Sequence, residues 1–203
     1  MAPPTLILVA GLPGTGKTHL SRLIADHVGN CEQVCLDQIK ERLWDQVGFQ
    51  GPQEKAAIDQ RALKVFFQEV GAAMGRSRVV LSDYPFSSKQ GPALAALCAR
   101  HGFTPLTVRL VADLDVLYER QRLRDLNSSR HLGHILTSYR PGDQLTERQE
   151  ADGLLTREEL RRRCTTRGYG SFALGEVLEV DMSDFDAVDH PAILAWLDEH
   201  MRD

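Results

Sequence analysis

Short apolar runs alternate with longer amphipathic segments along the chain. The first run, Leu6–Val9, is β-branched and short enough to be typical of a buried parallel strand. Runs that predict further strands follow at 33–36, 79–81, 104–111 and 177–180. Segments with apolar residues three or four apart, which predict helices, lie at 17–28, 37–47, 53–74, 89–101, 112–125, 156–164 and 186–201. Alternating strands and helices predict an α/β fold whose five-stranded parallel sheet, in the order 2-3-1-4-5, carries helices on both faces.

The first strand and the first helix are joined by GLPGTGKT, residues 11–18, which matches G-x-x-x-x-G-K-[ST] in full. Gly11, Gly14 and Gly16 let the backbone turn tightly and aim several N–H groups at one point. The helix that follows adds the positive end of its dipole there. Lys17 supplies a cation for the β- and γ-phosphates, and Thr18 offers a hydroxyl to Mg²⁺. The predicted ATP-binding segment also includes Leu12, Pro13, Thr15 and His19.

Aspartates follow the second and third predicted strands. Asp37 comes directly after 33–36, and Asp83 lies two residues after 79–81. The carboxyl ends of parallel strands form the ligand side of an open α/β sheet. We therefore expect Asp37 to act in catalysis and Asp83 to bind Mg²⁺ through water; the alternatives are a helix N-cap and a turn residue. Tyr84 begins a loop that either lines an acceptor pocket or packs.

Arginines gather at the end of the helix predicted over 112–125. Arg120 and Arg124 are four residues apart and share one face of it, and Arg130 follows in the polar segment 127–139. We expect this segment to close over a bound nucleotide as a mobile lid, with the arginines directed at the triphosphate.

Two further groups of polar residues allow a simpler interpretation. His131 and His134 are three residues apart, which is compatible with a metal site. The sequence offers no third ligand at a spacing typical of zinc, so we do not expect a zinc site here. The run Arg161–Arg163 is interpreted as a solvent-exposed face, with a docking patch as the alternative.

Composition limits the classes of protein that the chain can be. Its 203 residues, 42% of them hydrophobic, suit a single domain over 1–203, with a lid at 127–139 and a helical insertion at about 140–170. The net charge of −4 argues against a general nucleic-acid binder. Four cysteines without a CxxC pair indicate reduced thiols in a cytoplasm. No signal peptide or apolar stretch of membrane-spanning length is visible, and the sequence does not decide between a monomer and a homodimer.

Four motifs together resemble the phosphate-loop (P-loop) kinases of small molecules and nucleotides. They are GLPGTGKT, LDQIK at 36–40, LSDYP at 81–85, and LYERQRLRD followed by SRHLGH between 117 and 134. This group includes chloramphenicol phosphotransferase, the zeta-toxin kinases, gluconate and shikimate kinases and the kinase domain of polynucleotide kinase. The resemblance spans residues 6–134, whereas 135–176 carries no recognisable motif.

The resemblance implies an ATP- and Mg²⁺-dependent kinase with defined roles for its residues. Asp37 would accept the proton of an acceptor hydroxyl, and Lys40 would steady acceptor or phosphoryl oxygens. Asp83 and Tyr84 would lie beside the acceptor. Lys17 would act in catalysis with Arg130, and Arg120, Arg124 and Arg130 would hold adenine or phosphates.

The sequence also departs from the pattern of this group. Cys35 stands where some relatives carry the first acid of a D-x-D motif, so Mg²⁺ would depend on Thr18, water and Asp83. Lys40 replaces an arginine and cannot make its bidentate contacts.

The expected reaction is transfer of the γ-phosphoryl group of ATP to a hydroxyl of a small molecule such as an antibiotic, sugar or nucleoside. One alternative is a kinase of the zeta-toxin or polynucleotide type. Another is a nucleotide-dependent ATPase or switch without an acceptor, although the chain contains no N-K-x-D guanine-binding motif.

Overall fold

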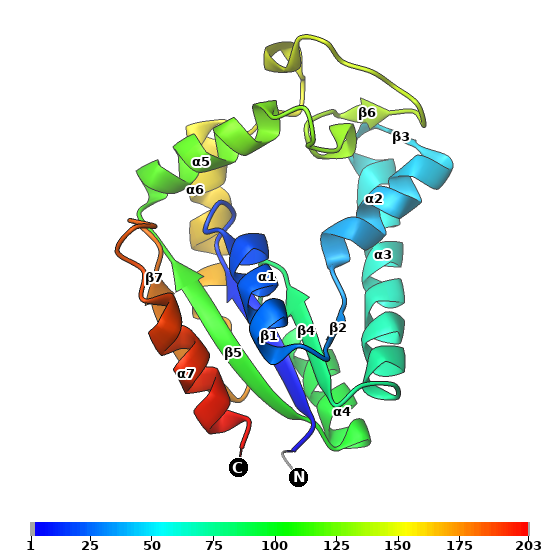
Figure 1. Cartoon of the computed structure of the whole chain (residues 1–203). Helices are drawn as coiled ribbons and strands as arrows, with labels where there is room; N and C mark the ends of the chain where they lie inside the picture. Colours follow the sequence, from blue (N-terminus) through cyan, green and yellow to red (C-terminus); the bar gives the residue numbers. More distant parts are fainter. Residues whose placement is uncertain (1–2, 203) are drawn as a thin grey trace.

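A five-stranded parallel sheet forms the centre of the computed structural model, which describes residues 3–202 (Figure 1). Its strands are β1 (Thr5–Gly11), β2 (Glu32–Gln33), β4 (Val79–Asp83), β5 (Thr104–Val111) and β7 (Glu176–Asp181). They lie in the order β2-β4-β1-β5-β7, and each pairing is parallel. Counted along the chain, these five strands have the order 2-3-1-4-5, so the predicted fold is confirmed.

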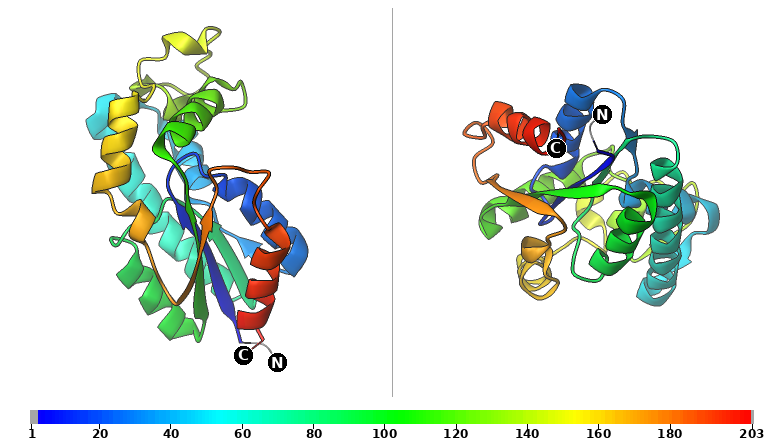
Figure 2. Two further views of the ribbon diagram at one scale, coloured as in Figure 1. Left: turned by 90° about the vertical axis from the view of Figure 1, so that its left-hand side faces the viewer. Right: turned by 90° about the horizontal axis from the view of Figure 1, so that it is seen from below.

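Helices cover both faces of the sheet (Figure 2). The residues of β1 alternate between them: Leu6 and Leu8 pack toward α3 (Gly51–Met74) and α4 (Gly91–His101), while Ile7 and Val9 pack toward α1 (Lys17–Val28) and α7 (His190–His200). Successive side chains of a strand point to opposite faces, and both faces are covered here. The central strand is therefore apolar throughout, as its sequence indicated.

Most of the remaining elements stand above the carboxyl ends of the strands (Figure 1). They are the helices α2 (Leu36–Val47), α5 (Leu114–Leu126) and α6 (Arg157–Thr166), the antiparallel pair β3 (Phe49–Gln50) and β6 (Ser138–Tyr139), and the 3₁₀ turns η1 (Leu132–His134) and η2 (Arg148–Glu150). A third 3₁₀ turn, η3 (Tyr169–Ser171), lies beside β1 and β5. The carboxyl ends of the central strands consequently open into a space enclosed by these elements.

Some predicted boundaries were wrong. The second strand ends at Gln33, and α2 already begins at Leu36, so Asp37 lies inside the first helical turn and Cys35 holds the N-cap position. The segment 48–52, which lies between two predicted helices and carries no predicted element, forms β3 and the start of α3.

The last helix also begins later than predicted, at His190 rather than residue 186. The side chain of Asp189 accepts the backbone N–H of Ala192 and defines its start. Thr156 is the N-cap of α6, at the start of the helix predicted over 156–164, and its hydroxyl accepts the N–H of Glu159 at 3.1 Å.

The four cysteines are free. Among residues 3–202, none of the helices combines the length and the apolar character needed to cross a bilayer.

Candidate active site

The P-loop connects β1 to α1 at the carboxyl end of the sheet. Gly11, Gly14 and Gly16 have φ angles of 131°, 86° and 84°, a region that side chains disfavour. A Cβ atom at Gly14 would also lie 2.9 Å from the carbonyl oxygen of Leu117. Because α1 starts at Lys17, the unpaired N–H groups of its first turn adjoin this loop. The loop therefore has the backbone form that binds phosphates.

Lys17 is held across the loop by backbone oxygens. Its ammonium donates to the carbonyl oxygens of Gly11 at 3.2 Å and Leu12 at 2.8 Å. Burial lowers the pKa of Lys17 to about 8, although the carboxylates of Asp37 and Asp83 oppose this effect. Phosphate oxygens form stronger hydrogen bonds with an ammonium than neutral carbonyls do, so a bound phosphate can attract this side chain away from the loop.

Thr18 and Asp83 lie together, as predicted. The hydroxyl of Thr18 donates to Oδ2 of Asp83 at 2.7 Å, although 65 residues separate them. A hydroxyl and a carboxylate are the hard oxygen donors that Mg²⁺ prefers, so this pair fits that cation.

The other predicted residues of the loop differ in exposure. His19 is exposed, and its ring lies edge-on to that of His190. Leu12 instead packs against Leu117 and Leu160, beneath α5 and α6.

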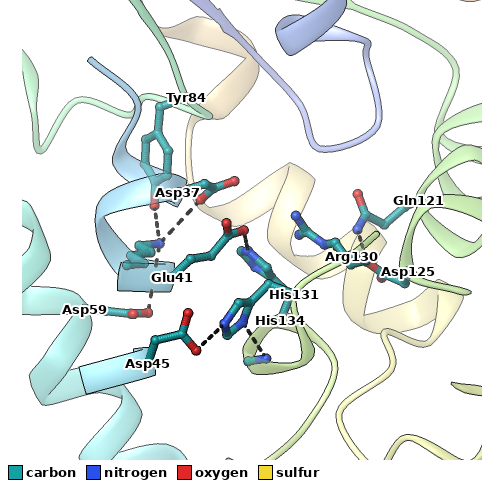
Figure 3. Close-up of polar contacts among 12 residues, drawn as sticks. Asp37, Glu41, Asp45, Asp59, Tyr84, Gln121, Asp125, Arg130, His131 and His134 are labelled. Carbon is teal, nitrogen blue, oxygen red and sulfur yellow. Dashed lines mark hydrogen bonds and ion pairs between the residues drawn. The ribbon is translucent and has the colours of Figure 1, made fainter. Parts of the chain in front are cut away.

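Asp37 belongs to a charged network that continues along α2 and α3 (Figure 3). The ammonium of Lys40 donates to the hydroxyl of Tyr84 at 2.9 Å, and it lies 4.0 Å from Oδ1 of Asp37 and 3.9 Å from Oδ2 of Asp59. Burial disfavours the charge of Asp37, but Lys40, His134 and nearby arginines outweigh burial and lower its pKa to about 2. The Asp37 carboxylate is therefore ionised at physiological pH.

The three predicted arginines reach the site in different ways. Nε of Arg130 lies 3.4 Å from Oδ1 of Asp125, and its N–H is buried without a hydrogen-bond acceptor among residues 3–202. Arg124 is exposed along the pocket wall. Arg120 donates to the carbonyl oxygens of Met182 at 2.5 Å and residue 183 at 3.0 Å, and its guanidinium lies 3.5 Å from the centre of the Phe185 ring. The loop before α7 thus holds Arg120, whereas the side chain of Arg124 makes no hydrogen bond or ion pair within residues 3–202.

The segment 127–139, predicted to be a lid, packs onto α2. Nε2 of His134 lies 2.7 Å from Oε1 of Glu41. Asp45 contacts Nε2 of His131 at 3.0 Å (Figure 3). The same carboxylate accepts a hydrogen bond from the hydroxyl of Tyr139 at 2.5 Å. Nδ1 of His131 accepts the N–H of residue 133, so its proton lies on Nε2 and is donated to Asp45. The histidines thus pair with acids of α2, and residues 3–202 contain no group of three side chains suited to a metal ion.

Apolar side chains reinforce this docking. Trp44 of α2 and Ile135 of the segment are buried together with Phe49 and Tyr139, in a cluster separate from those that pack on the sheet. The pairing of β3 with β6 joins the same two regions, because Phe49 lies opposite Tyr139.

One pocket of about 670 Å³ connects these groups. Sequence reasoning missed several of the residues that line it, among them Lys55, Arg163, Arg167 and Tyr169. The interpretation of Arg161–Arg163 as wholly solvent-exposed was wrong for Arg163, because α6 turns this residue toward the pocket. The spacing of four between Arg163 and Arg167 was the one available signal, since it places both on one helix face.

A family model described as an AAA domain matches residues 6–140. The chain belongs to this AAA domain family. None of the curated proteins matches it. Among solved structures, this AAA domain is similar to a proposed kinase from Chloroflexus aurantiacus J-10-fl, at 25% identity over 98% of this chain and 99% of that chain, with a TM-score of 0.76.

Two more distant structures share the fold. A gluconokinase from Sinorhizobium meliloti 1021 is 16% identical over 98% of this chain and 96% of that chain, with a TM-score of 0.55. A tunicamycin resistance protein from Deinococcus radiodurans is 14% identical over 98% of this chain and 95% of that chain, with a TM-score of 0.53. The predicted resemblance to the P-loop kinase group is confirmed, and the chain is a P-loop kinase-like AAA domain.

Proposed function

We propose that this AAA domain transfers the γ-phosphoryl group of ATP to a hydroxyl of a small molecule. The observation that carries the proposal is that the P-loop and a second carboxylate, Asp37, line the same pocket. A protein that only binds a nucleotide has no need of a carboxylate paired with Lys40 beside the triphosphate site, and a hydrolase would use that carboxylate to orient water rather than an acceptor. A kinase needs a group there to orient the attacking hydroxyl.

The residues around the P-loop fit ATP and Mg²⁺. Lys17, Arg124 and Arg130 would hold the phosphates, and Arg120 would contact the adenine beside Phe185. Thr18 and Asp83 would hold Mg²⁺, which when bound neutralises charge on the β- and γ-phosphate oxygens. A cytoplasmic location fits this proposal, because ATP is supplied there.

Asp37 would act mainly by orienting the acceptor. The acceptor oxygen forms a bond to the γ-phosphorus while the bond from that phosphorus to the β–γ bridging oxygen breaks and ADP leaves. The hydroxyl proton passes to the Asp37 carboxylate. A carboxylate with a pKa of about 2 is a weak base, so the proton moves late, after the new bond has made it acidic. The loose transition state of phosphoryl transfer requires little base strength at earlier stages.

The segment 127–139 would be the lid of this kinase. When it is docked on α2, Arg130 lies close to Asp37, and its charge helps to keep that carboxylate ionised. Docking would thereby bring a cation to the transferring phosphoryl group and exclude water from it.

Transfer of label from [γ-³²P]ATP to a panel of sugars, nucleosides, aminoglycosides and amphenicols tests the proposal. Wild type should label a small product, and the isosteric variant Asp37→Asn should transfer about 10²- to 10⁴-fold more slowly while still binding a non-hydrolysable ATP analogue. Release of free phosphate alone, at equal rates from both proteins, would instead indicate an ATPase or a switch.

A further inference from the structure

The pocket carries much more positive than negative charge. Its walls contain nine basic side chains and three aspartates. The basic ones are Lys17, Arg22, Lys40, Lys55, Arg120, Arg124, Arg130, Arg163 and Arg167. The triphosphate would engage those near the P-loop and on α5, but Lys55 and Arg163 come from α3 and α6 and have no part in the proposed nucleotide site.

Lys55 lies beyond Asp37 along the charged network of α2 and α3. Lys40 contacts both Asp37 and Asp59, and Asp59 follows Lys55 by one helical turn. An acceptor whose hydroxyl reaches Asp37 can therefore extend toward Lys55 along this wall of the pocket.

The ammonium of Lys55 has only weak partners. Its nearest hydrogen-bond acceptor is the carbonyl oxygen of Leu136 at 3.4 Å, and it lies 5.3 Å and 5.1 Å from the rings of Trp44 and Phe49. Burial lowers its pKa, and nearby cations, including Arg163, lower it further, although Asp59 opposes them.

The two carboxylates near Lys55 also face other groups. Oδ2 of Asp59 lies 3.9 Å from the ammonium of Lys40, while its Oδ1 is buried without a hydrogen-bond partner among residues 3–202. Asp152, whose charge Lys55 also feels, is hydrogen-bonded to the N–H and hydroxyl of Thr137. A partly buried cation that lacks a close counterion is costly, and an anionic ligand would lower that cost.

Arg163 offers the complementary hydrogen-bond donors. Its Nε donates to Glu159 at 2.6 Å, but Glu159 is shared with two bonds from Arg162. The two outer nitrogens of Arg163 make no hydrogen bond within the described part of the chain, residues 3–202. A guanidinium with free outer nitrogens binds a carboxylate or phosphate through two parallel hydrogen bonds.

We propose that Lys55 and Arg163 form an oxyanion subsite for the phosphoryl acceptor, which would carry a carboxylate or phosphate besides the hydroxyl that reacts. The subsite gives a function to α6, which comes from the part of the chain without a recognisable motif. That the bound anion is part of the phosphoryl acceptor rests on the proposed kinase function. Binding of an anion to the subsite can be measured without catalysis.

A binding experiment tests the subsite directly. The P-loop is first saturated with Mg²⁺ and a non-hydrolysable ATP analogue, and inorganic phosphate or malonate is then titrated by calorimetry. Wild type should bind one of these anions, and the double variant Lys55→Met/Arg163→Gln should bind it at least about tenfold more weakly. Methionine keeps the apolar stem of Lys55 against Trp44. Equal binding by wild type and double variant would overturn the subsite.

The matched control is Arg161→Gln, which removes an exposed charge from the same helix and should leave anion binding unchanged. Circular dichroism melts of all variants establish that they fold. The phosphate and malonate titrations distinguish a phosphorylated acceptor from a carboxylic acid.

Transfer assays separate this inference from the kinase proposal. Hydroxy acids are compared with their methyl esters, and sugar phosphates with the free sugars. For the anionic acceptor that receives the labelled phosphoryl group, Arg163→Gln should raise the KM for that acceptor about ten- to a hundredfold with little change in kcat. Transfer to neutral acceptors that is unaffected by Arg163→Gln would reject the subsite and keep the kinase. Anion binding without transfer to any acceptor would keep the subsite and reject the kinase.

Discussion

The substitution Ile135→Ala tests whether the segment 127–139 is an independent lid. Ile135 is 0% exposed and packs with Trp44 and Phe49, away from the clusters that hold the sheet. Removing its three outer carbons costs about 2.4 kcal/mol of transfer free energy, and the cavity raises the loss to about 2–5 kcal/mol. If the substitution destabilises only the docked state, by about 3 kcal/mol, the equilibrium constant for docking falls about a hundredfold.

Hydrogen exchange measured by mass spectrometry reports this change directly. Amides of 127–139 should lose about a hundredfold of their protection, while those of β1 keep theirs. The global free energy of unfolding in urea should fall by no more than the lid's own docking free energy. The initial rate of phosphoryl transfer should fall too, because Arg130 would spend less time near the reacting groups.

Ile24→Ala is the matched control. Ile24 is likewise 0% exposed, but it packs α1 against the sheet. Its loss should lower the global free energy of unfolding by about 2–5 kcal/mol without selectively exposing the lid. If Ile135→Ala instead exposes the lid and β1 together, the segment is part of the core and the reasoning is refuted.

Four further predictions concern the nucleotide site. Because the pKa of Lys17 is about 8 and its charged form binds phosphate, kcat/KM for ATP should fall about tenfold between pH 7 and pH 9 in stopped-time assays; a flat profile would contradict this. Lys17→Ala should abolish transfer at every pH. Asp83→Asn should raise the Mg²⁺ concentration for half-maximal activity about tenfold or more, and an unchanged titration would exclude Asp83 as a ligand. Arg120→Met should raise the KM for ATP about tenfold, because the contact with Phe185 and the hydrogen bonds to the loop before α7 are lost. The KM for the acceptor should not change.

The core of the fold could be predicted because its signals are local. The apolar run Leu6–Val9 followed by GLPGTGKT defines a strand, a phosphate loop and a helix within a short stretch, and α1 has the predicted bounds. The contact between Thr18 and Asp83 follows from the sheet order, because parallel strands bring their carboxyl ends together.

The elements around the acceptor pocket could not be predicted in the same way. β3 and β6 have two residues each and pair across about ninety positions, so neither carries a strand signal of its own. The spacing of Arg163 and Arg167 shows that they share a helix face, but not which surface that face meets. That depends on how residues 140–170 fold back over α5, a long-range property without a local pattern.

Helix α2 links the two ends of the site in a single rigid body. Asp37, Glu41 and Asp45 follow one another at intervals of four residues, so they lie along one side of the helix and span about 12 Å. The carboxylate that faces the acceptor and the acids that hold the lid cannot move independently. Within residues 3–202, no hydrogen bond or ion pair joins α6, which forms the pocket wall with Arg163, to α2. Natural variation in α6 could therefore change which molecules are accepted while the coupling between lid position and Asp37 stays the same.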